Sequence, residues 1–285
     1  METKQNTGTL LGAADIRAIA AEAGISPTKK FGQNFVIDPG TVRKIVRTAG
    51  VTAASRVLEV GPGLGSLTLG LLETGAHVTA IEIDTPVAER LPQTVGQFMP
   101  DAADRLRVIE MDALKATPEN TGITTDESLT LVANLPYNVA TPIILTLLER
   151  FENITSFVVM VQKEVADRLS AHPGNKVYGV PSVKLAWYGS AAPAGVIGRN
   201  VFWPAPHVDS ALVEFHRSEQ PLDPQLRDEV FTLIDAAFSQ RRKTLRAVLK
   251  KLVSEDAFTK AGIDSSRRGE TLSIDEFIAL AQARA

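Results

Sequence analysis

Short apolar runs alternate with amphipathic stretches through the middle of the chain, and this alternation limits the fold more than any other feature. The apolar runs cover residues 56–60, 77–83, 106–111, 129–133 and 157–161, and helical patterns cover 66–73, 86–98, 141–150 and 163–170. Such alternation is typical of parallel βαβ units with helices on both faces of the sheet. Two more apolar runs, at 194–197 and 208–215, are separated by a Pro-rich turn, which favours antiparallel pairing at the sheet edge. The sequence therefore predicts an α/β fold with a mostly parallel, seven-stranded sheet.

The two ends of the chain have a different, helical pattern. Amphipathic stretches cover 10–23 and 39–48 near the start and 224–237, 242–252 and 274–283 near the end. The apolar runs stop at about residue 217, and Pro221 and Pro224 mark a linker. We therefore expect a large α/β domain over residues 1–216, which includes N-terminal helices in residues 1–50, and a small α-helical domain over residues 217–285.

Composition excludes several classes of protein. The 285 residues include no cysteine and four histidines, so disulfides, zinc ribbons and thiol nucleophiles are excluded and a His-based metal site is not expected. The start of the chain is polar and lacks the apolar core of a signal peptide, and no apolar run approaches the ~20 residues of a membrane span. The sequence therefore predicts a cytoplasmic protein that uses neither a metal nor a membrane.

Charge is unevenly distributed along the chain. The formal net charge is −3, which alone argues against a nucleic-acid partner. However, residues 51–216 carry a net charge of −7, whereas residues 1–50 and 217–285 carry +3 and +1. Residues 241–251 (RRKTLRAVLKK) contain six basic side chains and no acid, a pattern that fits either a solvated helix face or a phosphate-binding surface.

A glycine loop follows the first apolar run. Residues 59–65 read Glu-Val-Gly-Pro-Gly-Leu-Gly and lead into a helical pattern. Glycine allows a tight strand-to-helix turn and a close approach of the backbone to a ligand. Glu82 ends the second apolar run, where a carboxylate can accept both hydroxyls of a ribose. The loop in this context predicts a nucleoside-containing cofactor, although a glycine loop by itself is a packing turn as often as a binding site.

The glycine spacing separates two kinds of cofactor. Dinucleotide-binding loops usually read GxGxxG and hold a pyrophosphate at the helix N-terminus. Here the loop reads GxGxG and is preceded by Glu59. This form resembles the Rossmann-like class I S-adenosylmethionine-dependent methyltransferases, whose cofactor has no phosphate. The resemblance implies S-adenosylmethionine as cofactor and S-adenosylhomocysteine as product, and it makes Asp112 the adenine-binding acid. Taken alone, Asp112 is also typical of a helix N-cap.

The sequence Asn134-Leu135-Pro136-Tyr137 follows the fourth apolar run, at the sheet edge where open α/β folds bind ligands. Amino-methyltransferases carry a similar (N/D)PP(Y/F) pattern there, and Leu135 replaces its first proline. The Asn134 side-chain carbonyl and the Leu135 backbone carbonyl can accept the two N–H groups of an adenine amine. Pro136 then fixes the backbone and Tyr137 can stack on the base. Outside this context the segment would be an ordinary turn.

Four further segments make the resemblance more specific. They are residues 31–35 (FGQNF), 161–169 (VQKEVADRL), 201–210 (VFWPAPHVDS) and 238–249 (FSQRRKTLRAVL). Together with EVGPGLG and NLPY, they resemble the ribosomal RNA adenine dimethyltransferases, and most closely the small-subunit (16S) group, over about residues 14–280. That family dimethylates the N6 amines of two adjacent adenosines in the 3′-terminal hairpin loop of 16S rRNA, in an assembling small ribosomal subunit.

The resemblance also implies roles for individual residues. Together with the glycine loop, it places cofactor contacts at Asn34, Val36, Glu59, Gly61, Gly63, Gly65, Glu82, Asp112 and Asn134. It places the target adenine at Asn134, Leu135, Pro136, Tyr137 and Phe202, although Phe202 also fits a core position at a strand turn. Residues 1–50 would then include a lid over the cofactor.

Two groups of basic residues are candidate RNA contacts, because binding RNA requires cations that neutralise phosphates. They are Lys29 and Lys30 near the start, and Arg241, Arg242, Lys243 and Arg246 in the tail. We therefore expect the 217–285 domain to bind RNA or the ribosome, and we expect the enzyme to act as a monomer.

Three other functions fit parts of the sequence. A 23S rRNA adenine N6-methyltransferase of the resistance type shares the chemistry, but the tail segment and VFWPAPHVDS favour the small-subunit enzyme. A non-catalytic RNA-binding or assembly factor could keep the fold, but the intact glycine loop and NLPY speak against it. A nicotinamide-dependent oxidoreductase is disfavoured by the GxGxG spacing and by NLPY.

Overall fold

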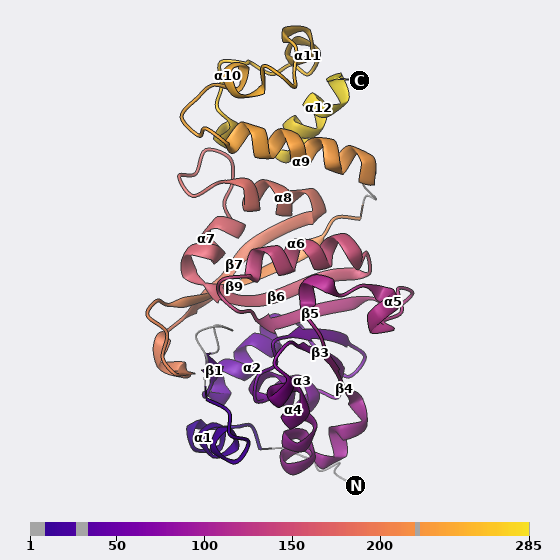
Figure 1. Ribbon diagram of the computed structural model, residues 1–285, viewed down its shortest axis with the longest axis vertical. Helices are drawn as coiled ribbons and strands as arrows, with labels where there is room; N and C mark the ends of the chain where they lie inside the picture. Colours follow the sequence, from indigo (N-terminus) through magenta and orange to yellow (C-terminus); the bar gives the residue numbers. More distant parts are fainter. Residues whose placement is uncertain (1–8, 27–33, 220–222, 285) are drawn as a thin grey trace. The chain divides into compact units, whose positions relative to one another are not determined.

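The computed structural model describes residues 9–26, 34–219 and 223–284 (Figure 1). The chain divides into two compact units. Unit 1 comprises Met1–Ala166 and Pro193–Phe215, and unit 2 comprises Asp167–Ala192 and His216–Ala285. The chain passes from unit 1 to unit 2 for the last time between Phe215 and His216, one residue before the boundary expected between residues 216 and 217. Residues 167–192, which we expected in the first domain, belong to unit 2 instead.

A seven-stranded sheet provides the framework, in the order β4-β3-β2-β5-β6-β9-β7. In that order the strands span Leu106–Glu110, His77–Glu82, Arg56–Val60, Leu129–Asn134, Ile154–Gln162, Ser210–Arg217 and Gly189–Ile197. Strand β2 pairs in parallel with both β3 and β5, while β3 pairs in parallel with β4 and β5 with β6. The predicted mostly parallel, seven-stranded sheet is confirmed. Strands β3 and β4 lie on one side of β2, and β5 and β6 lie on the other side. The strand order therefore reverses between β2 and β5, and the carboxyl ends of these two strands form a topological switch point.

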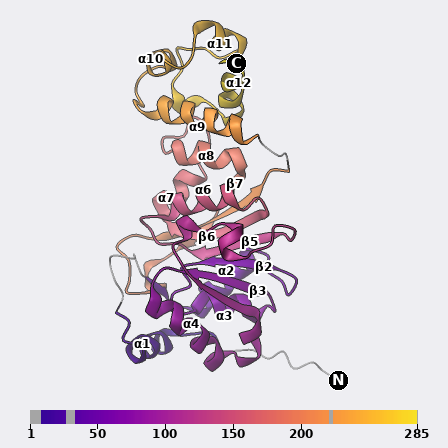
Figure 2. The same cartoon turned by 45° about the vertical axis from the view of Figure 1, so that its right-hand side comes forward.

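Unit 1 contains several helices besides this sheet. They are α1 (Ala13–Glu22), α2 (Pro39–Thr48), α3 (Ser66–Glu73), α4 (Thr85–Phe98), α5 (Pro118–Thr121) and α6 (Ala140–Arg150), and α7 (Lys163–Leu169) leads into unit 2. Helix α3 is buried over most of its length, and Figure 2 shows α3 and α4 beside β3. Asp38 caps the start of α2, because its carboxylate accepts the backbone N–H of Thr41 at 2.7 Å.

The core of unit 1 is made by the apolar strands. Leu58, Leu131 and Val159 are fully buried, which explains the continuous apolar runs in the sequence. Phe157 of β6 and Phe215 of β9 stack with their ring centroids 4.7 Å apart. This stack packs β9, which comes late in the sequence, against the neighbouring strand β6.

A small second sheet was not predicted. Strand β1 (Phe35–Val36) pairs antiparallel with β8 (Phe202–Trp203), with Phe35 opposite Trp203 and Val36 opposite Phe202. Two-residue strands leave no periodic signal, so the sequence indicated only loops here.

Unit 2 is mainly helical. It contains α8 (Val180–Tyr188), α9 (Pro224–Phe238), α10 (Leu245–Leu249), α11 (Glu255–Lys260) and α12 (Ile274–Arg284). Trp187 and Tyr188 of α8 lie edge-on to Phe231 of α9, with centroids 6.1 and 6.3 Å away. This packing explains why 167–192 joins unit 2. The helix predicted over 242–252 is wrong in extent, because residues 241–243 form a turn and only 245–249 are helical.

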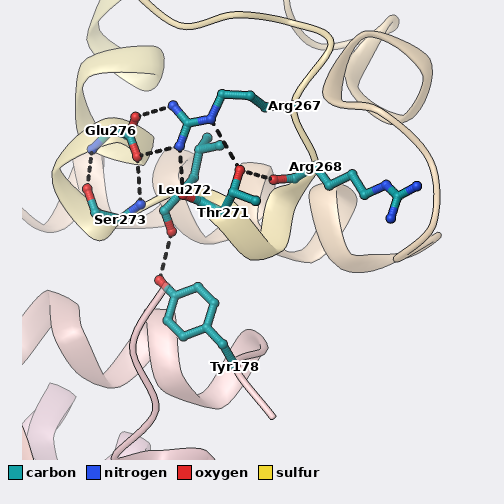
Figure 3. Close-up of polar contacts among 7 residues, drawn as sticks. All are labelled: Tyr178, Arg267, Arg268, Thr271, Leu272, Ser273 and Glu276. Atoms are coloured by element: carbon teal, nitrogen blue, oxygen red, sulfur yellow. Dashed lines mark hydrogen bonds and ion pairs between the residues drawn. The ribbon is translucent and has the colours of Figure 1, made fainter. Parts of the chain in front are cut away.

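Polar contacts fix the start of α12 (Figure 3). Arg267 pairs with Glu276, and the Glu276 carboxylate also accepts the backbone N–H of Ser273 at 2.9 Å. The Tyr178 hydroxyl donates to the backbone carbonyl of Leu272 at 2.8 Å. These contacts hold the segment before α12 against the loop that precedes α8.

Among the described residues, no helix has the length and apolar character required to cross a bilayer.

Two glycine substitutions test the close approach of α2 and α3. A Cβ at Gly70 would lie 2.3 Å from Cγ1 of Val42, whereas a Cβ at Gly96 in α4 meets nothing within 4 Å. We expect Gly70→Ala to destabilise unit 1 by about 1–3 kcal/mol through overpacking. We expect Gly96→Ala to stabilise it by up to about 1 kcal/mol, because alanine favours the helix. Thermal unfolding of both variants measures the difference, and equal effects would contradict the close packing.

Candidate active site

A cavity of about 240 Å³ lies at the carboxyl ends of β2, β3, β4 and β5 in unit 1. It contains most of the residues that the sequence singled out, although they are scattered over a hundred positions. Those that line it are Asn34, Val36, Glu59, Gly61, Gly63, Glu82, Asp112, Asn134, Leu135, Pro136 and Tyr137. Gly65 and Phe202 are not among its described lining residues.

The glycine loop forms the floor between β2 and α3. Gly61, Gly63 and Gly65 have φ values of +67°, +55° and +98°, which only glycine adopts without strain. A Cβ at Gly63 would lie 2.9 Å from the Phe35 ring, so the loop also requires glycine for space. Gly65 serves a structural role, because it caps α3 and a Cβ there would meet Leu91 at 2.9 Å.

Glu59 is a buried carboxyl on β2. Glu59 lines the cavity and is only 1% exposed. The Thr68 hydroxyl of α3 donates to its Oε2 at 2.7 Å. Burial raises the pKa of Glu59 to about 8, although the bond from Thr68 works in the opposite direction. Glu59 is therefore mostly protonated at neutral pH.

Glu82 is held in place by backbone donors at the end of β3. Its Oε1 accepts the N–H groups of Ile83 and Asp84 at 2.9 and 3.0 Å, and its Oε2 accepts that of Gly63 at 3.4 Å. Burial raises its pKa, and the three backbone bonds oppose that shift. Such a fixed carboxylate can accept a ribose diol.

Asp112 lies at the end of β4. Its Oδ1 accepts the backbone N–H of Leu114 at 2.9 Å, so it caps the short 3₁₀ turn Ala113–Lys115. Asp112 also lines the cavity, so the two interpretations of this residue are compatible.

The NLPY segment follows β5 beside the glycine loop. A Cβ placed on Gly61 would lie 3.7 Å from Cδ of Pro136, which shows how closely the two segments approach. The Asn134 amide donates from Nδ2 to the backbone carbonyl of Asn34 at 3.1 Å. The Leu135 N–H donates to the carbonyl of Met160 at 3.0 Å. With its amide nitrogen engaged, Asn134 retains its carbonyl oxygen as an acceptor.

Tyr137 is positioned from a distant strand. Its hydroxyl shares a 2.7 Å hydrogen bond with the hydroxyl of Ser210 in β9. The phenol is partly buried, which raises its pKa, so it stays neutral at physiological pH. The bond fixes the ring at the cavity mouth.

The rim of the cavity depends on β1 and β8. The Ser66 hydroxyl at the start of α3 donates to the Val36 carbonyl at 2.6 Å, and the Ile37 N–H donates to the Val201 carbonyl at 2.8 Å. Phe202 is 3% exposed and belongs to the apolar core around β1. The structure therefore places Phe202 among the apolar residues that support β1, and its contact with the target base stays a prediction.

The predicted RNA contacts differ in their surroundings. Arg241 pairs with Glu270 at 2.7 Å and donates to the Lys176 carbonyl at 2.6 Å, and Arg246 pairs with Glu255 at 2.6 Å. Arg242 and Lys243 are exposed on the turn before α10. Lys29 and Lys30 lie outside the described residues.

Comparison with known proteins decides the family. The model of the family "Ribosomal RNA adenine dimethylase" matches residues 26–285. The chain belongs to the ribosomal RNA adenine dimethylase family. It is also similar to "Ribosomal RNA small subunit methyltransferase A" of Bifidobacterium adolescentis, with 70% identity covering 97% of this chain and 94% of the relative. The protein of the same name from Streptomyces griseus is 55% identical, covering 96% of this chain and 94% of the relative.

Solved structures agree with this assignment. A dimethyladenosine transferase from Plasmodium falciparum aligns with a TM-score of 0.71 and 25% identity, covering 86% of this chain and 95% of that one. The 23S rRNA methyltransferase ErmE aligns with a TM-score of 0.67 and 24% identity, covering 88% and 99%. The latter likeness shows the fold alone. The predicted class I methyltransferase fold is confirmed.

The cavity of this dimethylase fits S-adenosylmethionine, the cofactor of the family. A Cβ on Gly61 would point at the Pro136 ring and the backbone carbonyl of Asn134, so the glycine keeps this space open. The carboxylates suit hydroxyl and cationic groups, and Ile83, Ala113 and Leu114 offer apolar surface for a base.

Several supporting residues of the dimethylase escaped the sequence analysis. Ser66 and Thr68 each hold another site residue by a hydroxyl, and no motif marks them. Ser210 holds Tyr137 in the same way; it ends the segment 201–210 that the sequence singled out, but nothing in the sequence indicated this role. Ile83 could have been noticed, because it ends the apolar run 77–83 directly after Glu82; in the structure it is 49% exposed and lines the cavity.

Asn134 variants separate chemistry from cofactor binding in this dimethylase. We expect Asn134→Ala to lower kcat by about 100-fold, because an acceptor fixed at the reacting amine is lost. The Kd for S-adenosylmethionine should change far less. Asn134→Asp keeps an acceptor oxygen but loses the donor to Asn34, and should retain more activity than Asn134→Ala. Comparable losses in kcat and Kd would show that Asn134 mainly holds the cofactor.

The buried Glu59 makes the stability of the dimethylase depend on pH. A carboxyl whose pKa is raised on folding stabilises the protein fully below the unfolded pKa of about 4.5, and this contribution is lost as pH rises through about 8. Glu59→Gln mimics the protonated acid and should remove the effect. From pH 5.5 to 7.5, we expect the wild type to lose roughly 2 kcal/mol relative to Glu59→Gln, measured by chemical unfolding. Parallel pH profiles would contradict a protonated Glu59.

Proposed function

We propose that this enzyme dimethylates the N6 amines of two adjacent adenosines in the 3′-terminal hairpin loop of 16S rRNA, in the assembling small ribosomal subunit. The observation that carries the proposal is the meeting of NLPY with the glycine loop and Glu82 in one cavity. The 70% identity to a small subunit methyltransferase over nearly the whole chain supports this choice of RNA.

Each side of the cavity has a proposed task. S-adenosylmethionine, when bound, supplies a methyl group on a positively charged sulfur. Glu82 would hold its ribose, and Asp112 with Ile83 would hold its adenine. On the other side, the carbonyl oxygens of Asn134 and Leu135 would accept the N–H groups of the target amine.

The amine itself limits the reaction, because its lone pair is delocalised into the adenine ring. Two acceptors favour a pyramidal nitrogen whose lone pair is directed at the methyl group. Tyr137, fixed by Ser210, would stack on the flipped base. Positioning then supplies much of the rate acceleration.

The competing functions receive less support. A 23S rRNA methyltransferase shares the fold, but ErmE is only 24% identical to this chain. A non-catalytic assembly factor would not need Asn134 and Glu82 in such defined positions. The expected monomer and the cytoplasmic location remain predictions.

A direct assay tests the function. Labelled S-adenosylmethionine is incubated with unmethylated 30S subunits, and the RNA is digested to nucleosides. We expect N6,N6-dimethyladenosine in 16S rRNA, at four methyl groups per RNA. Absence of this nucleoside under conditions in which the cofactor binds would overturn the proposal, and label in 23S rRNA would favour the alternative.

Charge reversal tests the tail as an RNA-binding surface. Arg242 and Lys243 are the better targets, since Arg241 and Arg246 also stabilise unit 2 through ion pairs. We expect Arg242→Glu/Lys243→Glu to weaken binding to 30S subunits by at least about tenfold and to reduce its salt dependence. The control Lys260→Glu/Arg284→Glu changes the net charge equally at other exposed positions. Equal weakening by both variants, or a matching loss of cofactor affinity, would contradict a specific surface.

A further inference from the structure

The described lining of the cavity is acidic. It contains the carboxyl groups of Glu59, Glu82 and Asp112, and none of its described members is a lysine, arginine or histidine. Charges in a protein cavity interact more strongly than in water because the surroundings are less polarisable. Such a site distinguishes ligands by their charge.

Glu59 differs from the other two carboxyls in its bonding. Glu82 accepts three backbone N–H groups and Asp112 accepts one, and such donors stabilise an anion. Glu59 is bonded by the Thr68 hydroxyl, which can pair with either a carboxylate or a carboxylic acid. Thr68 is completely buried, so water does not replace this bond.

None of the described groups that line the cavity around Glu59 carries a positive charge. Glu82 on β3 and Asp112 after β4 are acidic, Tyr137 after β5 is a neutral phenol, and the Thr68 hydroxyl on α3 favours the ionised form of Glu59 only through its hydrogen bond. The negative charge of Glu82 adds to the effect of burial in raising the pKa of Glu59. S-adenosylmethionine and S-adenosylhomocysteine both carry an ammonium group, but only S-adenosylmethionine adds a positively charged sulfur, and this additional charge favours the ionised form of Glu59.

We propose that Glu59 releases its proton when S-adenosylmethionine enters the cavity and keeps it when S-adenosylhomocysteine enters. The two ligands share the same nucleoside and amino-acid groups, and they differ in the methyl group and the positive charge on sulfur. The proton passes to solvent, and no bond forms between Glu59 and the ligand. Glu59 thereby favours the charged methyl donor over the neutral product. This inference rests on the proposed binding of the cofactor in this cavity.

Proton-linked binding has a defined pH signature. Below the pKa of Glu59, the affinity for S-adenosylmethionine falls about tenfold for each unit of decreasing pH, since one proton must leave. The affinity for S-adenosylhomocysteine changes much less over the same range. The preference for donor over product therefore increases from pH 6 to pH 8.

Titration calorimetry of the full chain measures this linkage. Each ligand is titrated at pH 6, 7 and 8 in phosphate and in Tris, whose different ionisation enthalpies reveal the number of protons released. At pH 7 we expect S-adenosylmethionine to release nearly one proton more than S-adenosylhomocysteine. Because both ligands carry the same amino group, the difference isolates the charge on sulfur.

Three variants assign the proton. Glu59→Gln should abolish the difference between the ligands. Thr68→Val removes the bond that lowers the pKa of Glu59, so it should move proton release to higher pH while the carboxyl remains. Glu119→Gln, at an exposed carboxyl on α5, makes the same substitution outside the cavity and should leave proton release unchanged. The Thr68 variant keeps the test informative if Glu59→Gln fails to fold.

Two results would overturn the inference without affecting the cofactor site. One is equal proton release with both ligands, and the other is an unchanged difference in Glu59→Gln, which would assign the proton to Glu82. Failure of the wild type to bind S-adenosylmethionine would instead overturn the proposed cofactor site, and this inference with it.

Discussion

Parallel pairing of β2 with β3 on one side and β5 on the other is the constraint on which the rest of unit 1 depends. It brings the ends of these strands to one edge, where Glu59, Glu82 and Asn134 meet although they are far apart in the chain. The buried side chains of β2 and β5 stabilise this pairing, because both faces of these strands pack against the core. The positions of the functional side chains in the cavity therefore depend on the apolar packing of the strands that carry them.

The sequence predicted the central fold well because its signals are local. Apolar runs and capping residues such as Asp38 act within a few positions, and they defined most strands and helices of unit 1 correctly. The glycine loop and NLPY could also be located, since parallel topology places strand ends together. Their mutual contact at Gly61 and Pro136 followed from that topology.

What the sequence missed depends on contacts between distant segments. The pairing of β1 with β8, the bond between Ser210 and Tyr137 and the packing of Trp187 on Phe231 each join residues that are more than forty positions apart. Phe202 illustrates the difficulty: its residue type fitted a base contact, but its burial beneath β1 is set by a partner in another part of the chain. Periodicity within a short window carries no information about such partners.

The pairing of Phe35 with Trp203 has a consequence for how the protein is made. A ribosome synthesises the chain from its N-terminus, so β1 waits for about 170 further residues before β8 exists. The strands β2 to β6 can assemble earlier, because they are complete by residue 162. The pairing of β1 with β8 at the rim of the cofactor cavity can therefore form only after the strands and the glycine loop that make its floor. During synthesis, the nascent chain carries an open cavity, and it becomes competent to bind its cofactor fully only once most of the protein has emerged.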